Sequence, residues 1–192
     1  MPVPDHRASL RGALEQDPHP TAAGGDRLAA VLALLIEEPT PSLLFTERAL
    51  HLNRHAGEVS FPGGLWEPQD AGILDTALRE THEEIGLDPV LPDVLGALPA
   101  VHTFVSGILV TPFVGVVRDL PPLEESAAEI ARVLVVATRT LASVERKREL
   151  RRAGTVWSGW SYDVGEAIVW GATGAMLHAF LELVRVEAPW LV

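Results

Sequence analysis

Three glutamates stand close together in one short segment of the chain: Glu80, Glu83 and Glu84. Their i, i+3, i+4 spacing would place them side by side on one face of a helix. Such like-charged neighbours cost only about 0.2–0.5 kcal/mol a pair on an exposed helix, so a solvated acidic face is one interpretation. The other is a site for a hard cation, because Mg²⁺ prefers carboxylate oxygens and commonly bridges them to substrate phosphates.

The segment around these glutamates has the pattern of a short, two-faced helix. Asp75 is its expected N-cap and Gly86 its expected C-terminal glycine. Arg79 lies four residues before Glu83 and is expected to pair with it. The face opposite the glutamates is mostly apolar and contains Leu74, Ala77, Leu78, Thr81 and Ile85.

The elements that must position this helix are strands. Residues 27–38 predict a buried strand and 43–48 a second one, joined by the turn PTPS. Gly63 and Gly64 precede the helix, so their backbone carbonyls can approach the same ion. Further strands are expected at 94–103, 108–119 and 130–138, then a hairpin at 155–171 and an amphipathic helix at 172–187.

These elements predict an α+β fold in which helices are inserted between hairpin-like runs of strands. We expect residues 1–25 to form an N-terminal arm that packs on one domain spanning residues 26–192. The basic segment 139–152 fits either a helix or a turn leading into a strand, and the sequence assigns it no role.

Composition excludes several classes of protein. The 192 residues include no cysteine, which rules out disulfides, thiolate metal sites and cysteine nucleophiles. The net charge of −11 argues against nucleic-acid binding. The apolar run 28–36 is shorter than the roughly 20 residues that a bilayer requires, so no membrane association is expected. The N-terminus lacks an apolar secretion signal, and we expect a cytoplasmic protein.

The segment RETHEEIGL, residues 79–87, resembles the second half of the Nudix hydrolase signature, with Thr81 at a position that is usually apolar. The first half differs, because Asp70 stands where the signature has glutamate and the gap to Arg79 is one residue longer. A connection of this kind resembles that of the coenzyme A pyrophosphatase branch of the family. The segment AIVWGATGAML near the C-terminus also resembles a segment of that branch. That branch also has an upstream motif matched here by Leu43, Leu44, Thr46, Arg48, His55, Gly57, Val59, Phe61, Pro62, Gly63 and Gly64.

The resemblance implies a Nudix-type α/β/α sandwich with a mixed sheet and a divalent cofactor, Mg²⁺ or Mn²⁺. The metal ligands that it implies are Glu80, Glu84, Glu83 and the backbone of Gly64. The branch hydrolyses coenzyme A, a small-molecule substrate, to 3′,5′-ADP and 4′-phosphopantetheine. The two alternatives are a Nudix hydrolase for another nucleoside diphosphate derivative, such as ADP-ribose or NADH, and a non-catalytic nucleotide sensor.

Other residues are expected to bind substrate and move protons. Arginine forks suit phosphate oxygens, so Arg48, Arg54 and His55, upstream of the Pro-Gly-Gly turn, are the expected substrate-binding residues. A glutamate that holds a cation is a poor proton acceptor, so a general base from outside the helix is expected. Glu129, just before the strand 130–138, is the first choice, with Glu125 and Glu83 as alternatives.

Overall fold

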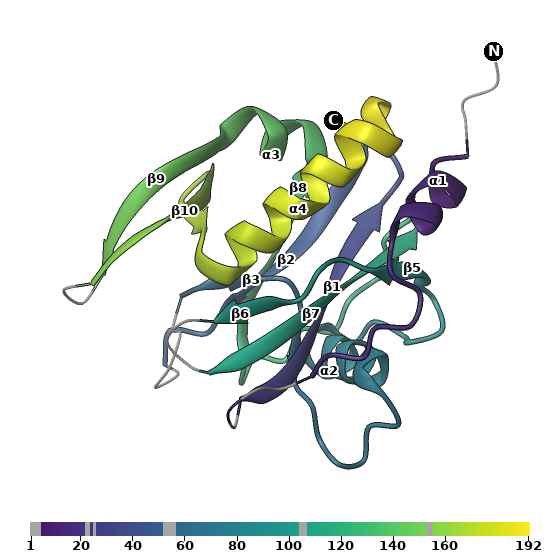
Figure 1. Cartoon of the computed structure of the whole chain (residues 1–192), viewed down its shortest axis with the longest axis horizontal. Coiled ribbons are helices and arrows are strands. Elements are labelled where there is room, and N and C mark those ends of the chain that lie inside the picture. The colour runs from purple at the N-terminus through teal and green to yellow at the C-terminus, as the bar shows by residue number, and fades with distance from the viewer. Residues whose placement is uncertain (1–4, 22–23, 25, 52–56, 104–106, 153–154) are drawn as a thin grey trace.

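A computed structural model describes residues 5–21, 24, 26–51, 57–103, 107–152 and 155–192, apart from the side chains at 150–152, 155 and 157. Helices lie on both sides of a mixed sheet (Figure 1). No helix in the described part of the chain has the length and apolar character needed to cross a membrane. The helices are α1 (His6–Ala13), α2 (Ile73–Ile85), α3 (Thr138–Val144) and α4 (Gly171–Glu187), followed by a short 3₁₀ turn (Pro189–Leu191).

The main sheet has the order β3-β2-β1-β7-β5, with β4 paired to β1, β6 to β7 and β8 to β2. Its central strands β1 and β7 run parallel over ten residue pairs, whereas the other pairs are antiparallel. The expected mixed sheet is confirmed. Its strands are β1 (Arg27–Ile36), β2 (Ser42–Arg48), β3 (Val59–Ser60), β4 (Gly63–Leu65), β5 (Asp93–Ala97), β6 (Val101–Thr103), β7 (Ile108–Val117) and β8 (Ile130–Ala137).

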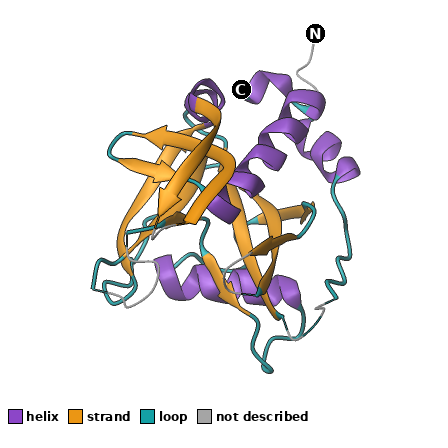
Figure 2. Ribbon diagram, turned by 60° about the vertical axis from the view of Figure 1, so that its left-hand side comes forward, coloured by secondary structure: helices purple, strands orange, loops and turns teal. Residues whose placement is uncertain are grey.

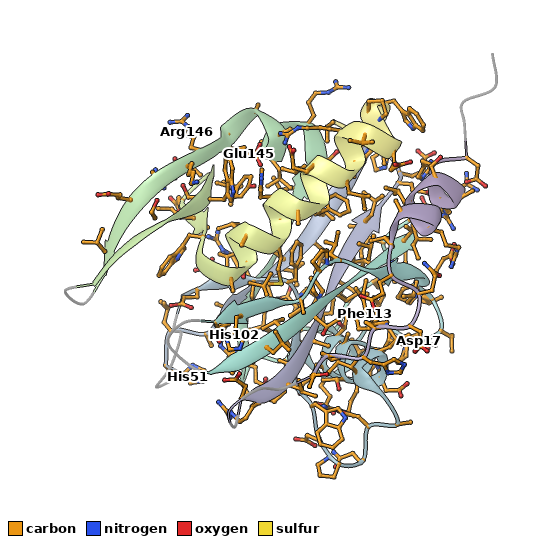
Figure 3. The ribbon with its side chains drawn as sticks, viewed as in Figure 1. Asp17, His51, His102, Phe113, Glu145 and Arg146 are labelled. Carbon is orange, nitrogen blue, oxygen red and sulfur yellow. The ribbon has the colours of Figure 1, made fainter. Side chains whose placement is uncertain are left out.

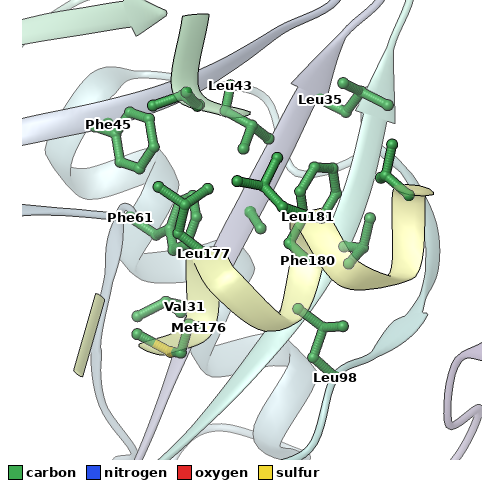
Figure 4. Packing of buried hydrophobic residues seen from close by; sticks show 14 of the residues in the cluster. Val31, Leu35, Leu43, Phe45, Phe61, Leu98, Met176, Leu177, Phe180 and Leu181 are labelled. Atoms are coloured by element: carbon green, nitrogen blue, oxygen red, sulfur yellow. The ribbon is translucent and has the colours of Figure 1, made fainter. Parts of the chain in front are cut away.

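Strand β1 is apolar along its length because both of its faces are covered. Alternate residues enter two separate cores, one under α4 and one under α2. Figure 2 shows helices on the two sides of the strands, and Figure 4 shows α4 packing Met176, Leu177, Phe180 and Leu181 into the first core. The β1 residues facing α4 are Ala29, Val31, Ala33 and Leu35, and those facing α2 are Ala30, Leu32, Leu34 and Ile36.

Helix α2 ends as expected but begins differently. Gly86 has a left-handed backbone, with φ of 70°, and its N–H donates to the carbonyl of His82. The expected N-cap at Asp75 is wrong, because the N-cap is Gly72, three residues earlier, and Asp75 lies in the first turn of the helix. The extended backbone of Gly72 starts the helix with no side-chain cap.

The segment 139–152 is mostly a strand. It leaves α3 and becomes β9 (Glu145–Arg152), which pairs with β10 (Thr155–Val164), and β10 pairs in turn with β11 (Ala167–Val169) in a second sheet. The expected hairpin at 155–171 is therefore confirmed. The single strand expected at 94–103 is instead divided into β5 and β6, with Pro99 between them. Helix α1 packs on α4 and β5, while the division into an arm and a domain stays a prediction.

A partly buried glutamate, Glu145 at the start of β9 (labelled in Figure 3), ties the β9–β10 hairpin to α4. Glu145 accepts hydrogen bonds from Tyr162 Oη at 2.7 Å and Arg185 Nη2 at 2.7 Å, and pairs with His178 Nδ1 at 2.9 Å. The ring of Trp160 stacks on His178 with centroids 3.8 Å apart. Burial alone would raise the pKa of Glu145, but the hydrogen bonds from these three partners lower it. The carboxylate is therefore stable as an anion in this position.

Candidate functional site

Glu84 is the buried member of the helix glutamates, with only 2% of its surface exposed. Its carboxylate receives weak support: the N–H of Gly63 at 3.3 Å, the hydroxyl of Thr46 at 3.5 Å, and Arg48 Nη1 at 3.9 Å. Burial raises the pKa of Glu84 to about 7, and the negative charges of Glu80 and Glu129 act in the same direction. The folded chain therefore holds a carboxylate whose charge is only partly compensated by Gly63, Thr46 and Arg48.

Glu80 lies against the glycine turn. Gly64 pairs with Ala30 in the sheet, and a Cβ atom at position 64 would overlap the Glu80 carboxylate. This close approach explains why glycine stands there and why the helix can sit against β4. Burial raises the pKa of Glu80, and the charges of Glu83 and Glu129 oppose its ionisation further, against the stabilising effect of Arg79.

Arg79 connects the helix to the loop that precedes it. Its guanidinium donates to both oxygens of Asp70, at 2.7 and 3.0 Å, and to the carbonyl of Leu65 at 3.1 Å. It also donates to Glu80 at 3.0 Å and to Glu83 at 3.2 Å, as expected for the i, i+4 pair. Its hydrogen bonds hold the pKa of Asp70 well below the usual range. Asp70 is thus engaged in fixing Arg79.

Glu129 approaches the same place from another segment. It is exposed, and its charge is close enough to raise the pKa of both Glu80 and Glu84. Its backbone carbonyl accepts from the N–H of Ala49 at 2.8 Å. The fold therefore brings a residue about fifty positions away in the sequence to the acidic face of α2.

The remaining predicted residues are divided. Glu83 is exposed and pairs with Arg79 away from Glu84. Arg48 lies beside Glu84, whereas Arg54 and His55 lie outside the described residues. The sequence predicts no role for Thr46, although it stands in the upstream motif, and none for Asp70. The signal for Asp70 was its occurrence with an extended gap before Arg79.

The acidic face is not by itself a complete cage for an ion. Among the residues that the structure describes, no three histidine, aspartate or glutamate side chains converge closely enough to hold a metal. Arg79 holds Glu83 aside, and Glu84 faces the sheet. Buried Glu84 and partly buried Glu80, whose negative charge raises the pKa of Glu84, nevertheless fit a divalent cation that has water and substrate as its other ligands, with exposed Glu129 close by.

The comparisons with known proteins agree with this geometry. Residues 26–142 match the profile of the family described as NUDIX domain. NudL of Salmonella paratyphi B, an uncharacterized Nudix hydrolase, is 38% identical over 157 residues, which cover 79% of this chain and 80% of that protein.

Solved structures show the same fold at lower identity. A MutT/nudix family protein from Enterococcus faecalis has a TM-score of 0.54 at 14% identity, covering 93% of this chain and 68% of that chain. The ORF135 protein of E. coli has a TM-score of 0.51 at 20% identity, covering 89% of this chain and 99% of that chain.

Proposed function

The chain belongs to the Nudix family, and from this premise we propose that it hydrolyses the pyrophosphate bond of coenzyme A and its derivatives to 3′,5′-ADP and 4′-phosphopantetheine. The observation that carries the catalytic part of this proposal is the buried Glu84 carboxylate, which has weak hydrogen bonds and two carboxylate neighbours. A purely structural glutamate would be neutralised by close donors.

We propose Glu80 and Glu84 as the main residues that hold the divalent cation, with Glu83 and the backbone of Gly64 as further ligands. Nudix proteins generally use Mg²⁺ or Mn²⁺, and such an ion supplies charge neutralisation at the phosphates and a more acidic water. Arg79, fixed by Asp70, orients Glu80 from the side. This support preserves the spacing of the carboxylates before substrate binds.

In the reaction, water attacks one phosphorus of the pyrophosphate, and the bond from that phosphorus to the bridging oxygen breaks. We propose Glu129 as the group that accepts the proton of the attacking water. Its support is that its charge reaches Glu80 and Glu84 from a separate segment. Glu125 and Glu83 are the alternatives for this role, and Glu83 is the weaker candidate because it pairs with Arg79.

Arg48 supports the binding of an anionic substrate. Its Nε atom is buried and makes no hydrogen bond to any residue that the structure describes. The side chain as a whole is 31% exposed next to the acidic face, so its terminal N–H groups suit a phosphate oxygen. Arg54 and His55 remain predicted substrate contacts. The preference for coenzyme A rests on the motif that spans 43–64, with Asp70 in place of glutamate.

The test is a substrate panel of coenzyme A, ADP-ribose and NADH with Mg²⁺ or Mn²⁺, with the products separated by chromatography. We expect coenzyme A to be cleaved fastest and excess EDTA to abolish turnover. Glu166→Gln, an exposed change in the β10–β11 turn, is the matched control for Glu80→Gln. Equal or faster cleavage of ADP-ribose or NADH would overturn the substrate assignment, and no cleavage of any of them would favour the sensor.

A further inference from the structure

The segment between β7 and β8 is attached to the end of α2 through its backbone. The N–H of Glu124 donates to the carbonyl of Ile85 at 2.9 Å, and the N–H of Ser126 donates to the carbonyl of Glu84 at 2.8 Å. A helix leaves its last carbonyls without partners, so these two bonds use acceptors that α2 itself cannot satisfy. Leu120 and Leu123 of the segment also pack on the core that contains Ile85.

Gly86 makes this attachment possible. A Cβ atom at position 86 would lie 2.9 Å from the Cβ of Glu124, 3.1 Å from its backbone nitrogen and 3.3 Å from its carbonyl oxygen. The contact of 2.9 Å is shorter than real Cβ atoms show. The contacts at 3.1 and 3.3 Å are to backbone atoms, which cannot move aside by a change of rotamer. Glycine is therefore needed here for space as well as for the left-handed backbone.

The attachment continues from Ser126 to Glu129. The Ser126 carbonyl accepts from the N–H of Glu129 at 2.9 Å and from the N–H of Ile130 at 2.8 Å. On the other side of this turn, Ala49 donates to the Glu129 carbonyl at 2.8 Å and His51 Nε2 lies 3.0 Å from the carbonyl of Ala128. One residue, Ser126, thus bonds through its N–H to Glu84 and through its carbonyl to Glu129.

We propose that Gly86 and Ser126 are positioning residues that fix the Glu129 turn relative to Glu84 through the main chain. This inference rests on the proposed function, since it assigns Glu84 to the cation and Glu129 to the attacking water. Its physical basis is that a displacement of about 1 Å in a reacting group can cost about 10²-fold in rate. These main-chain bonds thereby keep the exposed carboxylate of Glu129 at a fixed position relative to the buried carboxylate of Glu84.

Ser126→Pro tests the bond directly, because proline removes the N–H and keeps the carbonyl. We expect kcat to fall about 10- to 10²-fold with KM little changed, and the acidic limb of the kcat–pH profile to weaken. In a Glu129→Gln background the same change should cost almost nothing further, since it acts through Glu129. The conservative variant Ser126→Ala keeps the amide and should restore turnover. Fully additive losses would overturn the proposal.

Gly86→Asn provides a second test in case the proline variant fails to fold. Asparagine tolerates a left-handed backbone, so the variant mainly adds the atoms that collide with Glu124. The matched control is Gly165→Asn, because Gly165 has a φ of 65° and nothing within 4 Å of an added Cβ. We expect Gly86→Asn to lower kcat about 10-fold or more and Gly165→Asn to leave it unchanged. Equal effects of the two changes would overturn the proposal.

Amide hydrogen exchange separates this inference from the proposed function. In the wild-type protein the amides of Glu124 and Ser126 should be protected, and Gly86→Asn, unlike Gly165→Asn, should remove that protection. Mn²⁺ affinity should change little, because no ligand is altered. A wild-type protein that cleaves no substrate would overturn the proposed function while exchange still decides on the attachment. Unprotected amides in an active wild-type protein would overturn the attachment alone.

Discussion

Two glutamates with little solvent exposure, Glu84 and Glu145, have surroundings that differ in kind. Glu145, between β9, β10 and α4, has three close donors, Tyr162, His178 and Arg185, all within 2.9 Å. The side-chain carboxylate of Glu84, on α2, has no partner closer than 3.3 Å among the residues that the structure describes. The pKa of Glu145 is lowered in spite of burial, whereas burial raises the pKa of Glu84 to about 7.

This difference indicates that the Glu145 carboxylate has a structural role, whereas the Glu84 carboxylate is suited to bind a ligand. A buried charge costs several kcal/mol unless its surroundings return that energy. At Glu145 the protein returns it within its own fold, and nothing further needs to bind. At Glu84 the neighbouring carboxylates add to the cost, which the cation and phosphate of the proposed function would offset. The predictions that follow test this contrast.

The largest expected effect is on turnover. Glu84→Gln should lower kcat about 10²–10³-fold, the range found when one preorganised electrostatic group is lost. The metal-free variant should unfold at the same temperature as the wild type or slightly higher, because an uncompensated charge is removed. Steady-state kinetics and thermal unfolding in EDTA measure the two. A variant with wild-type kcat would show that the acidic face is only a solvated surface.

The second effect is a pH dependence of the metal-free protein. The pKa of Glu84 is about 7 in the folded protein, above its ordinary value of 4.5. The folded protein therefore binds this proton more tightly than the unfolded chain does. Unfolding therefore releases a proton between about pH 4.5 and 7, and stability falls as the pH rises through that window, by up to about 3 kcal/mol. Denaturant unfolding in EDTA at pH 5 and pH 8 measures it. Glu84→Gln should flatten the curve, and an unchanged slope in that variant would assign the effect elsewhere.

The structural glutamate should behave in the opposite way. Glu145→Gln removes a charge that three donors surround, and we expect a loss of about 2 kcal/mol, since hydrogen bonds to charged groups contribute about 1.5–3 kcal/mol. For a chain of this size that is a fall of about 4–8 °C in Tm. Activity should stay within about twofold below the unfolding temperature. A large loss of kcat with normal stability would break the contrast.

The smallest effect is expected at Asp70, which lies near the site but is well satisfied. Asp70→Asn weakens the two bonds from Arg79 and should cost about 1 kcal/mol, with a change in kcat of less than tenfold. If close hydrogen-bond donors, and not nearness to the site, decide the role of such an acid, a substitution at Asp70 should have effects like those of a substitution at Glu145. Thermal unfolding and kcat for the same preparation decide this, and a loss of activity as great as that of Glu84→Gln would show that location is what matters.

Local patterns in the sequence were enough to predict most of the fold. Some features depend only on neighbours in the chain, so the sequence predicts them without knowledge of the fold. These are the period of α2, its C-terminal glycine, the apolar run of β1 and the last helix. The start of α2 was predicted wrongly because an aspartate in the first turn and an N-cap aspartate look alike in sequence. Residues 145–152 of the basic segment form a strand because β10 pairs with them along their length, while residues 139–144 belong to α3.

The candidate site was only partly predictable, because its geometry depends on contacts between residues far apart in the sequence. The spacing of Glu80 and Glu84 was readable, but which of the two is buried depends on the sheet beneath them. The role of Asp70 depends on a loop that folds back to Arg79. The attachment of Ser126 to Glu84 consists of backbone atoms alone, and no side chain in the sequence could announce it.

The parallel pairing of β1 with β7 has a consequence for synthesis. Arg27 is paired with Ile108, so the central strand leaves the ribosome long before its neighbour exists. Until then its apolar residues 28–36 are exposed on both faces, and a strand of that composition readily associates with other chains. Folding must wait for a long-range contact, which makes it slow for a domain of this length. Nascent chains arrested before residue 108 should therefore be protease-sensitive and bound by chaperones, and complete chains, in which α4 covers the other face of β1, should not.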